Sequence, residues 1–264
     1  MYVKRKIKDK LPIIDYDNFY VVTDFDRTIT KGNSKTSWSI LASSDLVPKE
    51  YVKERQELYD YYRPIEIDEE MEISKKSKLV KEWFKKHIEL FVKYQTSEEV
   101  FEKAAMDLRV MEFREGAKEF IYFLHEHNIP LIIISAGIGN FIESFLKHND
   151  CYLDNIYISS NKIIFKDGIA NGVDKNIIHR LNKNEVSLPS NIANKIKGRN
   201  NVMLLGDQVS DLNMVNEELH DNVYKIGLLT DESSKNEKVM KDNFDIVCGL
   251  DNNYFDLMDV IFKD

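Results

Sequence analysis

Asp24 and Asp26 flank a single aromatic residue just after the apolar run FYVVT. This run is rich in β-branched and aromatic residues and predicts a buried strand, so both carboxylates lie where the strand ends. A second pair, Asp207 and Asp211, follows the apolar run NVMLLG. If the two strands are neighbours, four carboxylates surround one pocket. Charges held this close need a divalent cation, and all-oxygen ligands favour Mg²⁺ over zinc or copper.

The same acids have the chemistry for phosphoryl transfer. One carboxylate can attack phosphorus and form an aspartyl phosphate, while another with a raised pKa protonates the leaving oxygen and then deprotonates water. The phosphoryl group also needs hydrogen-bond donors and a cation. Ser135 ends the run IPLIIIS before a glycine-containing turn into a helix, which suits anion binding. A lysine between residues 175 and 183 would supply the positive charge.

Short apolar runs predict the strands that position these residues. They are apolar at consecutive positions, as expected of strands that are covered on both faces. The runs are FYVVTDF, IPLIIIS, NVMLLGD, NVYKIGL and FDIVCG. Helical patterns such as REGAKEFIYFLHEHN lie between them. Strands that alternate with helices indicate an α/β fold with a Rossmann-like parallel sheet, whose ligands bind at the carboxyl ends of the strands.

One long segment interrupts this alternation. Residues 33–108 contain no convincing strand and many charged residues along amphipathic helices, with Pro48 and Pro64 as expected helix boundaries. We therefore expect a helical cap domain at 33–108, inserted into an α/β catalytic core formed by residues 1–32 and 109–264.

Composition limits the classes of partner. The chain has 264 residues, of which 43% are hydrophobic and 31% charged, as in globular proteins. It shows no membrane-spanning stretch and no secretory signal, which predicts a cytoplasmic protein. A net charge of −8 argues against nucleic acid polymers as partners. Two distant cysteines do not indicate a disulfide or a zinc site. We expect a small phosphorylated substrate, no membrane partner, and a monomer or weak dimer.

Four motifs in this order resemble the haloacid dehalogenase superfamily of phosphohydrolases. DFDRT resembles its first motif D-x-D-x-T, IIISAG its serine motif, Lys183 its lysine, and GDQVSD its G-D-x-x-x-D motif. Other segments narrow the resemblance to the pyrimidine 5′-nucleotidase family. They are YYRPIEID, VKEWF, VMEFREGAKEF, IPLIIISAGIGN, IIHRLNKNE and LLGDQVSDLNM.

The resemblance implies roles for the acidic motifs. Asp24 would be the nucleophile and a Mg²⁺ ligand. Asp26 would be the general acid and base, with its backbone carbonyl on the metal. Thr28 would order this loop, Asp207 would bind Mg²⁺, and Asp211 would support the metal shell.

The phosphate-binding residues follow from the same resemblance. Ser135, Ala136 and Gly137 would hold the phosphate. Lys183 would bridge the phosphate and Asp24, although Lys175 competes for this role in the sequence.

In the cap, the resemblance implies three substrate contacts. Glu66 matches the family's base-recognising glutamate, and Phe84 occupies an aromatic position suited to stacking on a base. His87 stands where a serine that contacts the ligand is expected.

The sequence thus predicts a Mg²⁺-dependent phosphomonoesterase, a phosphoric monoester hydrolase that acts as a 5′-nucleotidase on pyrimidine nucleoside monophosphates. One alternative is a phosphatase of the same superfamily for another small phosphorylated metabolite. Another is a receiver-type signalling module, which also forms an aspartyl phosphate but is about half as long and lacks the insertion. A non-catalytic nucleotide-binding protein is disfavoured by the acids at positions 24 and 26.

Overall fold

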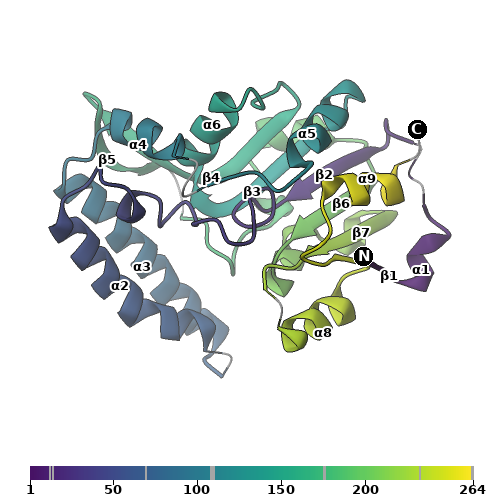
Figure 1. Cartoon of the computed structure of the whole chain (residues 1–264), viewed down its shortest axis with the longest axis horizontal. Coiled ribbons are helices and arrows are strands. Elements are labelled where there is room, and N and C mark those ends of the chain that lie inside the picture. The colour runs from purple at the N-terminus through teal and green to yellow at the C-terminus, as the bar shows by residue number, and fades with distance from the viewer. Residues whose placement is uncertain are drawn as a thin grey trace.

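The computed structural model describes residues 1–11, 13, 15–68, 70–107, 111–174, 177–231 and 233–262. Within them, an eight-stranded sheet with the order β1-β8-β7-β6-β2-β3-β4-β5 forms the centre of the molecule (Figure 1). The strands are β1 (Tyr2–Val3), β2 (Phe19–Thr23), β3 (Leu131–Ile138), β4 (Ile156–Lys166), β5 (Ile169–Asp174), β6 (Asn201–Gly206), β7 (Asn222–Leu228) and β8 (Ile246–Cys248).

The two strands that precede the acidic pairs are neighbours. β2 lies between β3 and β6 and runs parallel to both, with Thr23 opposite Ile133 on one side and Leu205 on the other. The sheet is parallel from β4 to β8, and β5 and β1 are antiparallel strands at its two edges. The predicted α/β fold with a mostly parallel sheet is confirmed, and the register brings Asp24 and Asp207 to adjacent strand ends.

β2 is buried on both faces, which explains its continuous apolar sequence. Phe19 and Val21 belong to a cluster with residues of α5, α6 and α9, whereas Tyr20 and Val22 pack with residues of α7 and β6. The helices of this part of the chain are α1 (Arg5–Lys8), α5 (Ala117–Glu126), α6 (Gly139–His148), α7 (Ser190–Ile196), α8 (Ser234–Asn243) and α9 (Tyr254–Ile261). Short 3₁₀ turns are η1 (Leu41–Ser43), η2 (Glu185–Ser187), η3 (Val209–Met214) and η4 (Glu217–Leu219).

The inserted segment is helical, as its sequence predicts. It contains α2 (Lys49–Ile67), α3 (Ile73–Lys93) and α4 (Glu98–Ala105), and the α2–α3 hairpin stands at one end of the sheet (Figure 1). α4 packs against α6 through Phe101 and Phe141, whose rings stack at 4.7 Å. The proposed domain boundary at 108/109 lies outside the described residues, so the division into cap and core stays a prediction.

Pro48 and Pro64 differ in their effect on α2. Pro48 immediately precedes the helix, as expected, but Pro64 lies inside it and the helix continues to Ile67. The prediction that Pro64 bounds a helix was therefore wrong. Because it lies near the end of α2, its missing N–H costs the helix one of its last bonds without stopping it. No helix in the described ranges is long and apolar enough to cross a membrane.

Gly206, the last residue of β6, gives a test of this packing. A Cβ at this position would overlap the Cβ of Asp211 in η3. We predict that Gly206→Ala lowers the free energy of unfolding by about 1–3 kcal/mol, as overpacking does. The matched control is Gly249→Ala, just after β8, where the nearest atom to the new Cβ is Asn252 Oδ1 at 3.6 Å. Urea unfolding of both variants measures the difference, and equal midpoints would contradict the prediction.

Candidate active site

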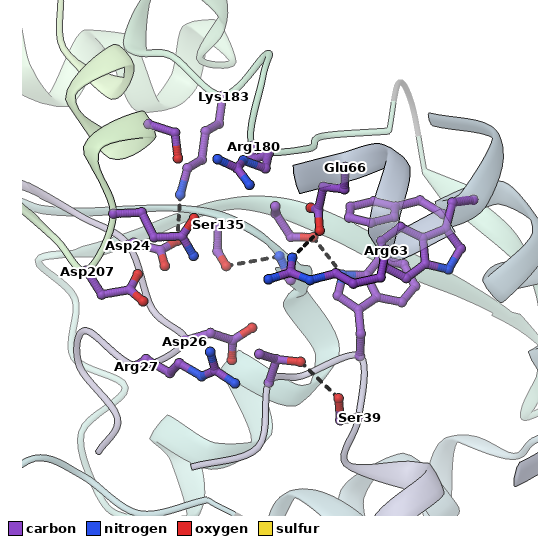
Figure 2. A pocket seen from close by; sticks show the side chains of 18 of the residues that line it. Asp24, Asp26, Arg27, Ser39, Arg63, Glu66, Ser135, Arg180, Lys183 and Asp207 are labelled. Carbon is purple, nitrogen blue, oxygen red and sulfur yellow. Dashed lines mark hydrogen bonds and ion pairs between the residues drawn. The ribbon is translucent and has the colours of Figure 1, made fainter. Parts of the chain in front are cut away.

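A cavity of about 220 Å³ lies between the strand ends and the α2–α3 hairpin. All but one of the residues that the sequence assigns to the site line it. They are Asp24, Asp26, Glu66, Phe84, His87, Ser135, Ala136, Gly137, Lys183, Asp207 and Asp211. Figure 2 shows the acids and Lys183 on one side and Glu66 on the other. The structure thus brings residues from the strand ends and residues from the α2–α3 hairpin into one pocket.

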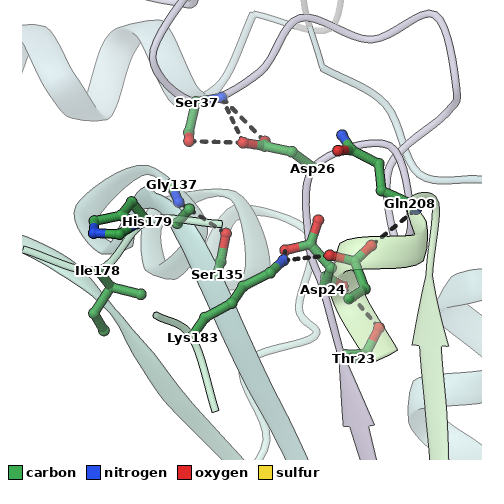
Figure 3. Close-up of polar contacts among 12 residues, drawn as sticks. Thr23, Asp24, Asp26, Ser37, Ser135, Gly137, Ile178, His179, Lys183 and Gln208 are labelled. Carbon is green, nitrogen blue, oxygen red and sulfur yellow. Dashed lines mark hydrogen bonds and ion pairs between the residues drawn. The ribbon is translucent and has the colours of Figure 1, made fainter. Parts of the chain in front are cut away.

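Lys183 joins two of the four acids in a buried ion cluster. Its Nζ lies 2.9 Å from Asp24 Oδ1 and 2.7 Å from Asp211 Oδ1 (Figure 3). The second oxygen of Asp211 accepts a hydrogen bond from the backbone N–H of Gln208 at 2.9 Å. Lys183 is therefore the lysine that contacts Asp24, while Lys175 lies outside the described residues.

The acids are more numerous than the one lysine can neutralise. Burial raises the pKa of Asp24 to about 7, against the opposing effect of Lys183 and with the help of Asp211 and Asp26. Burial, and then the charges of Asp211 and Asp24, raise the pKa of Asp207 well above its ordinary value. Burial acts to lower the pKa of Lys183, but the carboxylates of Asp211 and Asp24 outweigh it and raise that pKa. The carboxylates on the pocket floor therefore carry more negative charge than Lys183 offsets.

These acids fit a divalent metal ion. Asp24, Asp207 and Asp211 each offer a carboxylate oxygen, and the three oxygens lie within 4.8 Å of one another. The donor set consists of oxygen. Burial, and then the neighbouring carboxylates, raise the pKa of Asp24 and of Asp207, and a bound cation would oppose that rise. When bound, the ion would neutralise these carboxylates and the phosphate beside them. The contact assigned to the Asp26 backbone carbonyl stays a prediction.

Asp26 is held by a residue that the sequence did not single out. Its carboxylate accepts hydrogen bonds from the backbone N–H of Ser37 at 3.0 and 3.1 Å and from the Ser37 hydroxyl at 2.9 Å (Figure 3). Ser37 Oγ in turn accepts the N–H of Ile138 at 3.0 Å. Burial raises the pKa of Asp26 to about 6, although the bonds from Ser37 lower it. Ser37 therefore links the first motif to the end of β3.

Ser135 lies within β3 rather than at its end. The strand continues to Ile138, with an irregular register towards β4 after Ile134, and this corrects the expected strand boundary. Ser135 Oγ accepts the N–H of Gly137 at 3.0 Å. A Cβ on Gly137 would overlap the Ser37 hydroxyl, so this position requires glycine.

Thr28 is the predicted site residue that does not line the cavity. Its side chain is fully buried, and its hydroxyl has no hydrogen-bond partner among the described residues. In this loop, the Thr30 hydroxyl accepts the N–H of Arg27 at 2.7 Å. Arg27 has a left-handed backbone with φ of 64°. The loop-ordering role of Thr28 stays a prediction.

The cap side of the pocket is aromatic. Trp38 stacks on His87 with ring centroids 5.4 Å apart and lies 4.7 Å from the ring of Phe84. Burial lowers the pKa of His87 to about 3, so its imidazole is neutral at physiological pH. Neither ring nitrogen of His87 has a hydrogen-bond partner in the described part of the chain. Glu66, at the end of α2, forms an ion pair with Arg63.

Several lining residues were missed by sequence reasoning. They are Arg27, Trp38, Arg55, Arg63 and Arg180. Arg180 enters the pocket from the same segment as Lys183 (Figure 2). Its Nε is buried, and the described residues supply it with no hydrogen-bond partner. An arginine three residues before the lysine motif has no sequence signal that separates it from a surface arginine.

Comparison with known proteins identifies the family of this chain. The pyrimidine 5′-nucleotidase (UMPH-1) family profile matches residues 22–263. The chain is 35% identical to the 7-methylguanosine phosphate-specific 5′-nucleotidase of Homo sapiens over 248 residues, which covers 89% of this chain and 81% of that protein. The Drosophila melanogaster protein of the same name is 32% identical, with 88% and 75% covered.

Solved structures of related proteins also match this chain. The crystal structure of cytosolic 5′-nucleotidase IIIB bound to cytidine superposes with a TM-score of 0.83 at 30% identity and covers 93% of this chain and 85% of that one. An apo phosphoserine phosphatase shares the fold, with a TM-score of 0.58 at 16% identity over 92% of this chain and 98% of that one. The chain therefore belongs to the pyrimidine 5′-nucleotidase (UMPH-1) family of the haloacid dehalogenase superfamily, and it is a 5′-nucleotidase, a phosphoric monoester hydrolase.

Proposed function

We propose that this enzyme hydrolyses nucleoside 5′-monophosphates in a Mg²⁺-dependent reaction through an aspartyl phosphate on Asp24. The observation that carries the proposal is the position of the Asp24 carboxylate on the pocket floor, with one oxygen fixed by Lys183 and Asp207 beside it. The oxygen that Lys183 does not hold is available to a phosphorus atom above it.

In the first step, a carboxylate oxygen of Asp24 forms a bond to phosphorus while the bond from phosphorus to the ribose oxygen breaks. Asp26 donates its proton to that leaving oxygen, and its pKa of about 6 suits a group that must both give and take a proton near neutral pH. In the second step, water attacks the same phosphorus, Asp26 takes the water's proton, and the bond to Asp24 breaks. Inorganic phosphate leaves, and Asp24 is regenerated.

Phosphate binding falls to groups that can donate hydrogen bonds at the pocket floor. The Ser135 hydroxyl and the Lys183 ammonium are predicted to contact the phosphate oxygens, together with Ala136 and Gly137. We add Arg180 to this set, because it lines the pocket and its buried Nε finds no hydrogen-bond partner among the described residues, which suits an anion. The metal bound by the acids is proposed to be Mg²⁺, on the basis of oxygen-only ligands.

The base is proposed to bind between the aromatic rings and Glu66. Cytosine and 7-methylguanine are the bases in the ligand and substrate that the names of two relatives give. Both carry an exocyclic amino group, which can donate a hydrogen bond to a carboxylate. 7-Methylguanine is also cationic, and the rings of Trp38 and Phe84 beside a neutral His87 offer it a favourable environment. We therefore propose cytidine and 7-methylguanosine monophosphates as substrates, ahead of uridine monophosphate.

The oligomeric state, monomer or weak dimer, and the cytoplasmic location stay predictions. The alternative of a phosphatase for another small metabolite is disfavoured, since the chain belongs to a 5′-nucleotidase family. A receiver-type module would accumulate phosphoprotein without turnover, whereas the proposed enzyme should release phosphate repeatedly.

Phosphate release from a panel of nucleoside monophosphates, sugar phosphates and phosphoserine tests the proposal directly. Nucleotides should be the best substrates, EDTA should stop turnover, and Mg²⁺ should restore it. Asp24→Asn should abolish turnover, because the amide is a poor nucleophile. Asp26→Asn should still form phosphoenzyme from p-nitrophenyl phosphate, whose leaving group needs no proton. Full turnover in EDTA, or a normal rate in Asp24→Asn, would refute the mechanism.

Ser37 is predicted to align Asp26 for proton transfer. Ser37→Ala should lower kcat for cytidine monophosphate by about tenfold, the range of a lost charge-assisted hydrogen bond. Formation of phosphoenzyme from p-nitrophenyl phosphate should change less. The control is Ser34→Ala in the same loop, whose hydroxyl accepts the N–H of Glu112 at 3.3 Å outside the cavity. Equal rates in the Ser37 and Ser34 variants would show that Asp26 needs no such support.

Glu66 is predicted to recognise the base. Glu66→Ala should lower kcat/KM for cytidine and 7-methylguanosine monophosphates by about ten- to a hundredfold, while p-nitrophenyl phosphate stays within a few-fold. Glu57→Ala, on the exposed side of the same helix, is the control, and it should leave all substrates unaffected. If Glu66→Ala weakened nitrophenyl and nucleotide substrates equally, Glu66 would be a structural cap residue instead.

A further inference from the structure

Another buried carboxylate lies behind the active site, in η2. Glu185 comes two residues after Lys183, and its side chain is only 5% exposed. As far as the described residues go, it does not line the cavity, and the mechanism above does not use it. A buried carboxylate is costly unless hydrogen bonds satisfy it, so its partners indicate why it is there.

Glu185 has three partners, from two other segments. Its Oε2 accepts the phenol O–H of Tyr20 at 2.6 Å, and its Oε1 accepts the N–H of Asn216 at 2.8 Å. The Nε2 of His220 lies 2.9 Å from Oε1 and 3.2 Å from the Tyr20 oxygen. Burial, and then Glu185, raise the pKa of Tyr20, which keeps its phenol protonated as a donor. Both carboxylate oxygens are therefore satisfied.

The segments that meet at Glu185 are those that meet at Lys183. Tyr20 is on β2, four residues before Asp24, and Asn216 follows Asp211 by five residues. β2, the segment that carries Lys183 and the segment after β6 are thus joined at two places. One junction is the ion cluster on the pocket floor, and the other is the Glu185 cluster on the face of the sheet that Tyr20 shares with Leu188.

The turn that carries Lys183 has little regular structure of its own. Between β5 and α7, the described residues form only the three-residue η2. At its start the turn is held by Asn161, which bonds the N–H and the carbonyl of Ile178, each at 2.8 Å. At its end it is held by Glu185. A lysine side chain is flexible, so the place of its ammonium between two carboxylates depends on where this backbone is fixed.

We infer that Glu185 is a positioning residue for the reaction, which fixes the backbone of Lys183 relative to β2 and the Asp211 turn through Tyr20, Asn216 and His220. The inference rests on the proposed function of Lys183 in phosphate binding. In this role, Glu185 changes the affinity for phosphate only through Lys183.

A double-mutant cycle on the binding of inorganic phosphate tests this, because binding can be measured by calorimetry in Mg²⁺ without turnover. Glu185→Gln keeps the volume but converts one acceptor oxygen to a donor, and it should weaken phosphate binding by about tenfold. Tyr20→Phe removes one of the bonds and should weaken it a few-fold. In a Lys183→Ala background, Glu185→Gln should have less than a twofold further effect, because coupled residues are not additive.

The control separates positioning from general stability. Arg199→Met removes hydrogen bonds to the carbonyls of Tyr16 and Phe19, at 2.7 and 2.6 Å, at the opposite end of β2. It should lower the melting temperature and leave phosphate affinity unchanged. Additive losses in the cycle, or equal phosphate affinities in Arg199→Met and Glu185→Gln, would overturn the inference. If wild-type enzyme hydrolyses no phosphomonoester, the proposed function fails; if it does and the cycle is additive, only the role of Glu185 fails.

Discussion

The ion cluster of Lys183 with Asp24 and Asp211 is the interaction on which the rest of the site depends. A buried ion pair seldom stabilises a fold, since removing the charges from water costs about as much as their attraction returns. Its value here is geometric, because it joins residues 159 and 28 positions apart in the sequence. The parallel register of β2 and β6 makes this possible by placing Asp24 beside the strand that leads to Asp207 and Asp211.

The α2–α3 hairpin forms the side of the pocket opposite the strand ends. The strand ends supply the charged residues that are proposed to bind and transfer the phosphate. α2, α3 and the segment before them supply aromatic rings and one carboxylate, Glu66. The two sets meet through short polar contacts such as the bond from Trp38 Nε1 to the carbonyl of Ala136, at 2.9 Å. In the proposed function, recognition of the phosphate and of the group attached to it is therefore divided between two parts of the chain that share one cavity.

The sequence predicts the sheet and the acids well because both depend on local patterns. A buried parallel strand is continuously apolar. The residue after it lies at the edge of the sheet where ligands bind, and this does not depend on the sequence of the rest of the chain. Ser37 and Arg180 were not predictable, since Ser37 bonds residues that are distant in the sequence and Arg180 comes to line the pocket only in the folded chain. Pro64 and Ser135 show a second limit: a helix and a strand each continued past a residue that usually ends one, because tertiary packing outweighs local preference.

The close approach of Gly137 to Ser37 has an evolutionary consequence. Because any side chain at 137 would displace the hydroxyl that holds Asp26, these two positions are not free to change one at a time. A lineage that acquires alanine at 137 must lose or move the hydroxyl at 37 and then hold the Asp26 carboxylate by other means. Positions 37 and 137, one in the insertion and one in the core, are thus expected to covary among homologous sequences, although they lie 100 residues apart in the chain.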